Sequence, residues 1–129
     1  MDLRGEEIYM AIVLVVDDDP SQSNILKVIL SDEGYETYVA SSGGEALRIA
    51  ETLLPDVVLT DLWMPDMDGI ELMKKLISRV HAPEIIIMSA FGCTLQIIEA
   101  VGQGACRYLE KPLEKDSVLL NIKQVLERR

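Results

Sequence analysis

Acidic side chains stand directly after two segments of the sequence that are rich in branched apolar residues. Asp17 and Asp18 follow the first of these segments, and Asp61 follows the second. Carboxylates that cluster repel one another, so keeping all three ionised is costly unless a cation sits among them. A few carboxylates with bound waters suit Mg²⁺, and no cluster of histidine or cysteine in the sequence favours zinc. If the fold brings these acids together, the sequence predicts a magnesium site.

A hydroxyl group and an ammonium group follow two further apolar segments. Ser89 and Ala90 come after one of them, and Lys111 comes after the other. A carboxylate can attack phosphorus to form an aspartyl phosphate, while a metal ion and an ammonium group neutralise charge on the other phosphoryl oxygens. The Ser89 hydroxyl and the Ala90 backbone NH supply hydrogen-bond donors for those oxygens. These residue types indicate phosphoryl transfer onto an aspartate.

Five short segments have the composition of strands that are buried between helices. They are rich in Val, Ile and Leu, and the longest are apolar on both faces, which is typical of parallel strands covered by helices. The expected strands are Ala11 to Val16, Thr37 to Ala40, Asp56 to Thr60, Glu84 to Met88 and Arg107 to Leu109.

Helical spacing of apolar residues, with capping residues before it, fills the segments after these strands. The first three expected helices follow N-caps at Asp19, Ser42 and Asp68; the first continues until Gly34, Pro55 stops the second, and the apolar spacing of the third continues to Val80. Further helices are expected from Leu95 to Val101 and from Ser117 to Leu126. Strands and helices therefore alternate five times, which predicts an α/β fold with one doubly wound parallel sheet. In such sheets, ligands bind outside the carboxyl ends of the strands, where the candidate residues stand.

The composition of the chain limits the classes of protein to consider. Its 129 residues and 49% hydrophobic content suit one folded domain. A formal net charge of −10 argues against nucleic-acid binding by this chain. The apolar runs are far shorter than the roughly 20 residues of a membrane span, and the acidic start lacks the basic region of a signal peptide. We therefore expect a cytoplasmic protein that does not bind membranes.

Four motifs carry the candidate residues in an order and spacing that belong to a known family. They are IVLVVDDDP at residues 12–20, DVVLTDLWMPDMDG at 56–69, IMSAFG at 87–92 and GACRYLEKP at 104–112. The chain resembles the receiver domains of two-component response regulators, and most of all those of NtrC-like regulators. The resemblance implies a CheY-like, flavodoxin-like sheet of five strands in the order 2-1-3-4-5, flanked by five helices. It also implies a receiver domain at residues 10–127 and an N-terminal extension at residues 1–9.

The resemblance also assigns roles to the acidic residues. Asp61 matches the phosphoacceptor, Asp18 matches a direct metal ligand, and Asp17 matches a ligand that acts through water. The backbone carbonyl of Trp63 completes the share of the Mg²⁺ shell that the protein supplies.

The remaining motif residues match the groups that hold the phosphoryl group and respond to it. Lys111 would pair with the phosphoryl group, and Ser89 with the Ala90 NH would bind its other oxygens. The family usually holds the peptide bond before the residue matching Pro112 in the cis form. Ser89 and Tyr108 match a switch pair that changes the surface of the fourth helix, fifth strand and fifth helix.

The function implied is signalling rather than metabolic catalysis. A histidine kinase or phosphotransfer protein would supply the phosphoryl group, the domain would catalyse only its own phosphorylation and dephosphorylation, and a homodimer or output partner would use the switched surface. A haloacid-dehalogenase-like phosphatase is an alternative, but that family needs a second aspartate where Trp63 stands. A flavodoxin-like flavin carrier is another, but acids after the first strand would repel a flavin phosphate. The sequence leaves the kinase, the output partner and any further domain open.

Overall fold

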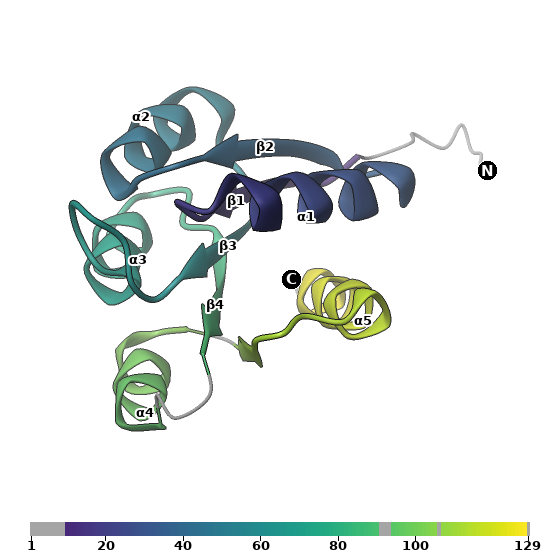
Figure 1. Cartoon of the computed structure of the whole chain (residues 1–129). Coiled ribbons are helices and arrows are strands. Elements are labelled where there is room, and N and C mark those ends of the chain that lie inside the picture. The colour runs from purple at the N-terminus through teal and green to yellow at the C-terminus, as the bar shows by residue number, and fades with distance from the viewer. Residues whose placement is uncertain (1–9, 91–93, 106, 129) are drawn as a thin grey trace.

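The computed structural model describes residues 10–90, 94–105 and 107–128, which form five strands and five helices in alternation (Figure 1). The strands are β1 (Ile12–Val16), β2 (Glu36–Ala40), β3 (Val57–Asp61), β4 (Glu84–Ser89) and β5 (Arg107–Glu110). The helices are α1 (Pro20–Asp32), α2 (Gly43–Leu53), α3 (Gly69–Ile77), α4 (Thr94–Gln103) and α5 (Lys115–Glu127). All ten predicted elements are confirmed, while the predicted N-terminal extension lies outside the described residues.

The five strands form one parallel sheet in the order β2-β1-β3-β4-β5, which confirms the expected topology. Val16 at the end of β1 pairs with Thr60 of β3. Asp61, the next residue, pairs with Met88 of β4. The carboxyl ends of these central strands are therefore level, and the residues that follow them leave the sheet along the same edge.

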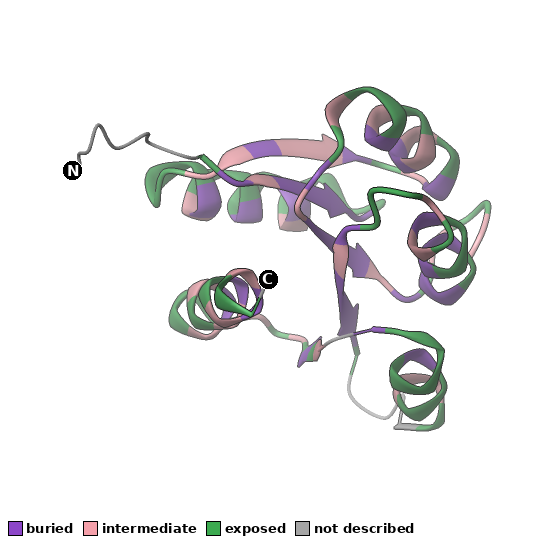
Figure 2. Cartoon of the chain, turned by 180° about the vertical axis from the view of Figure 1, so that it is seen from behind, coloured by how far each residue is buried: buried purple, intermediate pink, exposed green. Residues whose placement is uncertain are grey.

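Two apolar layers cover the two faces of the sheet, because successive strand residues point to opposite faces. In β1, Leu14 and Val16 pack on one face with α2, α3 and α4, while Val13 and Val15 pack on the other with α1 and α5. Figure 2 shows this arrangement, with buried strands at the centre and exposed residues on the outer sides of the helices. The packing fixes the strands, and with them the residues at the strand ends.

Side-chain caps start the first three helices where the sequence predicts them. The oxygens of the capping residues accept backbone bonds from Ser21 N to Asp19 (3.0 Å), from Glu45 N to Ser42 (3.1 Å) and from Glu71 N to Asp68 (2.8 Å). Each bond satisfies an amide that the helix itself leaves without a partner. Within the described ranges, every helix falls short of the length and apolarity needed to cross a membrane.

The predicted end of the third helix at Val80 is wrong. Helix α3 ends at Ile77, and Val80 is 95% exposed instead of continuing the apolar face. The Ser78 hydroxyl donates to the Lys75 carbonyl at 2.9 Å, which ends the last turn locally. Helical spacing alone placed Val80 on the buried face, but the chain has already turned away from the core there.

Candidate functional site

Four of the predicted site residues meet at the carboxyl edge of the sheet. Asp17 directly follows β1, Asp61 is the last residue of β3, Ser89 is the last residue of β4, and Lys111 directly follows β5. The parallel order of these strands brings together residues that lie up to 94 positions apart in the sequence. All four residues therefore stand at the carboxyl edge of the sheet, where the sequence predicts them, and their roles stay predictions.

Lys111 bridges two of the acids. Its Nζ atom lies 3.2 Å from Asp17 Oδ2 and 3.1 Å from Asp61 Oδ2. Burial alone would lower the pKa of Lys111, but the nearby Asp61 carboxylate, and after it Asp17, raise the pKa above its ordinary value. Lys111 therefore stays charged at neutral pH and offsets part of the acidic charge.

The Asp17 carboxylate is almost completely buried. Its Oδ1 accepts a hydrogen bond from Asp19 N at 3.0 Å, while Oδ2 faces Lys111. Burial raises the pKa of Asp17, and the charge of Asp61 adds to this effect, while the bond from Asp19 N and the charge of Lys111 oppose it. The net increase means that the fold disfavours the ionised form of Asp17 when no other cation is near.

Three carboxylates converge closely enough to hold one cation. Asp17, Asp18 and Asp61 each place an oxygen within 4.8 Å of the others, and their exposure runs from buried Asp17 to exposed Asp18. A cluster of carboxylate oxygens that is open to water on one side has the donor chemistry that Mg²⁺ takes with part of its hydration shell. The residues present therefore fit the expected cofactor.

The Ser89 hydroxyl adds a donor that no described residue uses. Ser89 is fully buried, and its Oγ atom makes no hydrogen bond within the described part of the chain. Buried hydroxyls normally have a partner, because leaving one unpaired costs about 1–3 kcal/mol. Lys111 N donates to the Ser89 carbonyl at 2.7 Å, which joins the ends of β4 and β5. Ala90 follows directly and is exposed.

The backbone around Lys111 agrees with the family pattern, since the peptide bond between Lys111 and Pro112 is cis. Tyr108, the expected switch aromatic, lies on the edge strand β5 and is half-exposed. Its switch role stays a prediction.

Trp63 is also half-exposed. In an extended segment, the side chains at positions 61 and 63 would point the same way, which would place the Trp63 ring beside the Asp61 carboxylate. Strand β3 instead ends at Asp61, and the chain bends at Leu62. The position of the ring relative to the carboxylate therefore stays a prediction.

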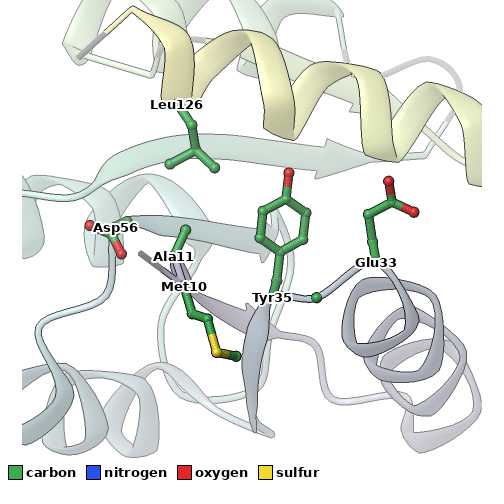
Figure 3. Close-up of a pocket in the computed structure, with 7 residues that line it drawn as sticks. Met10, Ala11, Glu33, Tyr35, Asp56 and Leu126 are labelled. Atoms are coloured by element: carbon green, nitrogen blue, oxygen red, sulfur yellow. The ribbon is translucent and has the colours of Figure 1, made fainter. Parts of the chain in front are cut away.

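A surface hollow elsewhere lacks this chemistry. It measures about 570 Å³. Its lining includes Ala11, Tyr35 and Asp56, which directly precede β1, β2 and β3 (Figure 3), whereas the acidic cluster lies at the carboxyl ends of the strands. Figure 3 shows the Tyr35 ring between Leu126 and Glu33. The Asp56 carboxylate beside it accepts a hydrogen bond from Ile12 N at 2.7 Å and so has a structural role at the start of β1.

Comparison with known proteins agrees with this geometry. Residues 13–123 match the family model described as the response regulator receiver domain. The chain belongs to this family. A receiver domain protein (CheY-like) from Methanospirillum hungatei superposes with a TM-score of 0.88 at 30% identity, covering 93% of this chain and 96% of that one. CheY4 of Vibrio cholerae superposes with a TM-score of 0.83 at 30% identity, covering 91% and 99%.

This receiver domain is also similar to part of longer regulators. It is 37% identical over 119 residues to the transcriptional regulatory protein KdpE of Mycobacterium tuberculosis, covering 92% of this chain and 52% of KdpE. It is 34% identical over 115 residues to the regulatory protein AtoC of Escherichia coli, covering 89% of this chain and 25% of AtoC. The chain thus spans about half of the first relative and a quarter of the second. Receiver domains act as phosphoacceptors in two-component signalling, interact with histidine kinases and generally bind Mg²⁺ at an acidic pocket.

Proposed function

We propose that Asp61 accepts a phosphoryl group from a histidine kinase or a phosphotransfer protein in the presence of Mg²⁺. The observation that carries this proposal is the single ammonium group of Lys111, which lies within 3.2 Å of the carboxylates of both Asp17 and Asp61. This contact brings a cation beside two carboxylates at the sheet edge, of which Asp61 is the nucleophile and Asp17 a metal-binding acid in this proposal. Family membership supports the cytoplasm as the place where this chemistry occurs.

The transfer step follows from the groups present. An Asp61 carboxylate oxygen attacks phosphorus, the bond from phosphorus to the donor's imidazole nitrogen breaks, and that nitrogen keeps the electron pair and takes a proton from water. Lys111 then pairs with a phosphoryl oxygen, and the unpaired Ser89 hydroxyl donates to another, with the Ala90 NH beside it. Bound Mg²⁺ would neutralise charge on the phosphoryl oxygens.

The metal ligands in this proposal are Asp18 and Asp61 directly, Asp17 through water, and the Trp63 backbone carbonyl. The convergence of the three carboxylates supports Asp17, Asp18 and Asp61 as members of this ligand set. Asp18 is exposed and so can bind an ion that keeps waters on its open side. An enzyme acting on other phosphate esters is disfavoured, because Trp63 stands where a haloacid-dehalogenase-like phosphatase needs its second aspartate.

Phosphorylation is proposed to alter the surface made by α4, β5 and α5. Movement of the Ser89 hydroxyl toward the phosphoryl group would free space behind it, and Tyr108 on the neighbouring strand would change its burial. This surface carries exposed apolar side chains that suit self-association or an output partner, namely Leu95, Ile98, Val101, Tyr108 and Leu120.

The proposed reaction is tested by incubating the protein with acetyl phosphate and following its intact mass. With Mg²⁺ present, one phosphoryl group should be added, and a chelator should prevent the addition. An added phosphomonoester should not be turned over. Equal labelling with and without Mg²⁺ would contradict the proposed metal role, and steady turnover of the phosphomonoester would favour the phosphatase class.

A further inference from the structure

Residues 62–68, which join β3 to α3, are fixed at their two ends. Leu62 N donates to the Met88 carbonyl at 3.0 Å, and Gly69 N donates to the Leu62 carbonyl at 2.7 Å. The residues between these bonds are exposed or half-buried. They include Trp63, whose carbonyl we propose as a metal ligand, so the middle of the segment needs a further restraint if that carbonyl is to hold its place.

Asp66 supplies a restraint that reaches a different helix. Its Oδ1 atom accepts from Gly43 N at 3.0 Å, and its Oδ2 atom accepts from Gly44 N at 2.8 Å. Gly43 and Gly44 are the first residues of α2, so both amides belong to the group that a helix leaves unpaired. Oδ1 also accepts from Met67 N at 2.9 Å. The bonds from Gly44 and Gly43 lower the pKa of Asp66, so the carboxylate is ionised at neutral pH.

Apolar packing reinforces these hydrogen bonds. The Met67 side chain lies so close to Gly43 that a Cβ atom there would be 2.3 Å from Met67 Cγ. Met67 also packs against the buried apolar layer on that face of the sheet. We call Gly43, Gly44, Asp66 and Met67 the α2 clasp, since together they hold the middle of segment 62–68 against the start of α2.

The start of α2 is itself connected to the acidic cluster. Strand β2 ends at Ala40, three residues before α2. The Ala40 carbonyl accepts a hydrogen bond from Asp17 N at 3.1 Å. The α2 clasp therefore connects the segment that contains Trp63 to the start of α2. The end of β2, which precedes α2, is in turn hydrogen-bonded to Asp17.

We propose that Asp66 is a positioning residue of the metal site. By binding the start of α2 with both carboxylate oxygens, it holds segment 62–68 so that the Trp63 carbonyl stays where it contacts Mg²⁺. This inference rests on the proposed function, because it requires the Trp63 carbonyl to be a ligand. A residue that only caps α2 would stabilise the fold without affecting metal affinity.

Asp68 provides a matched control. It lies in the same segment, carries the same charge and caps a helix through Glu71 N at 2.8 Å, but its bond stays within the start of α3 and does not reach α2. Asp66→Ala and Asp68→Ala therefore each remove one carboxylate that caps a helix, with two bonds to α2 amides lost in the first variant and one bond to an α3 amide lost in the second. Among these two variants, the α2 clasp is lost only in Asp66→Ala.

The test compares Mg²⁺ affinity by calorimetric titration with thermal unfolding of the metal-free proteins. Asp66→Ala should weaken Mg²⁺ binding about tenfold, at the lower end of the effect of losing a group that orients a metal ligand. Asp66→Asn keeps one acceptor oxygen and should fall between Asp66→Ala and the wild type. Asp68→Ala should also lower the unfolding temperature while changing Mg²⁺ affinity far less.

The possible failures are distinguishable. If the wild type does not bind Mg²⁺, the proposed function itself is wrong. If the wild type binds and Asp66→Ala weakens affinity no more than Asp68→Ala does, Asp66 is only a cap and this inference is overturned. If Asp66→Ala does not fold, Asp66→Asn decides: wild-type affinity would overturn the inference, and weaker binding at an unchanged unfolding temperature would support it.

Discussion

The Asp17 carboxylate has two opposing effects on the protein. It is part of the acidic cluster that fits a cation, yet it is buried beside Asp61 and its pKa is raised, first by burial and then by that neighbouring charge. Because folding raises this pKa, protonation of Asp17 favours the folded state. This contribution to the free energy of unfolding is fully present below the ordinary pKa of 3.8, and it is lost as the pH rises through the pKa of Asp17 in the folded protein. The metal-free protein is thus less stable at neutral pH because of this group.

Replacing Asp17 with Asn should expose this effect. In the presence of a chelator, Asp17→Asn should unfold at a higher temperature than the wild type at neutral pH, and the difference should shrink as the pH falls toward and below 3.8. Saturating Mg²⁺ should raise the unfolding temperature of the wild type more than that of the variant, because it binds the folded state through the removed carboxylate. A difference independent of pH would show that charge is not its cause.

Trp63 should report on the same site, because it is the single tryptophan of the chain and lies two residues after Asp61. Its half-exposed ring leaves room for its surroundings to change, so its fluorescence should shift when Mg²⁺ or beryllofluoride binds. A large apolar ring near the acceptor would hinder water from approaching phosphorylated Asp61, so Trp63→Asn should hydrolyse its phosphoryl group faster. Unchanged fluorescence together with an unchanged hydrolysis rate would show that the ring points away from the site.

At the scale of elements, the junction of β3 with α3 depends on close contact at Gly69. A Cβ atom on this residue would lie 2.4 Å from the Asp61 carbonyl oxygen, which belongs to the backbone and cannot rotate aside. Gly69→Ala should therefore push α3 away from the end of β3 and destabilise the fold by about 1–3 kcal/mol, as overpacking typically does. Denaturant unfolding monitored by circular dichroism measures this change.

Gly102 in α4 is the matched control for that substitution, since a Cβ atom there would meet nothing within 4 Å. Gly102→Ala should stabilise the protein by up to about 1 kcal/mol, because alanine is the better helix former. If Gly69→Ala were equally stabilising, the contact with Asp61 would not be as tight as described.

The elements were predictable where the sequence carries local signals. Strands buried on both faces are continuous apolar runs, and the caps at Asp19, Ser42 and Asp68 act on amides two or three residues away. The end of α3 was mispredicted because apolar spacing continues to Val80 after the helix has ended. The bond from Gly43 N to Asp66 was missed because it spans 23 residues, and nothing local distinguishes such an aspartate from one in a simple turn.

The site was predicted through its place in the whole molecule. Asp17, Asp61 and Lys111 became one candidate site because parallel strands end at a common edge and because their motifs resemble a known family. Their meeting at hydrogen-bond distance agrees with that reasoning. Two features of the site could not be predicted, because they depend on packing across several elements. They are the exposure of the Tyr108 side chain and the lack of a hydrogen-bond partner for Ser89 Oγ among the described residues.

Phosphorylation should change the protein beyond the acidic cluster itself, on the surface of α4, β5 and α5. A ligand shifts a conformational equilibrium only through contacts that differ between the two states, and Ser89 and Lys111 join the site to this side of the sheet. Hydrogen exchange with and without beryllofluoride should therefore show changed protection in these elements, including the strand that contains Tyr108. Changes confined to α1 would contradict this version of the switch.

The measurement that tests the central claim most directly is the mass of the protein and of its Asp61→Asn variant after incubation with acetyl phosphate and Mg²⁺. The wild type should gain one phosphoryl group that hydroxylamine removes, as an acyl phosphate requires. Asp61→Asn should not gain it, while Asp68→Asn, which changes a helix cap in the next segment, should gain it as the wild type does. If Asp61→Asn is labelled at the wild-type rate, Asp61 is not the phosphoacceptor.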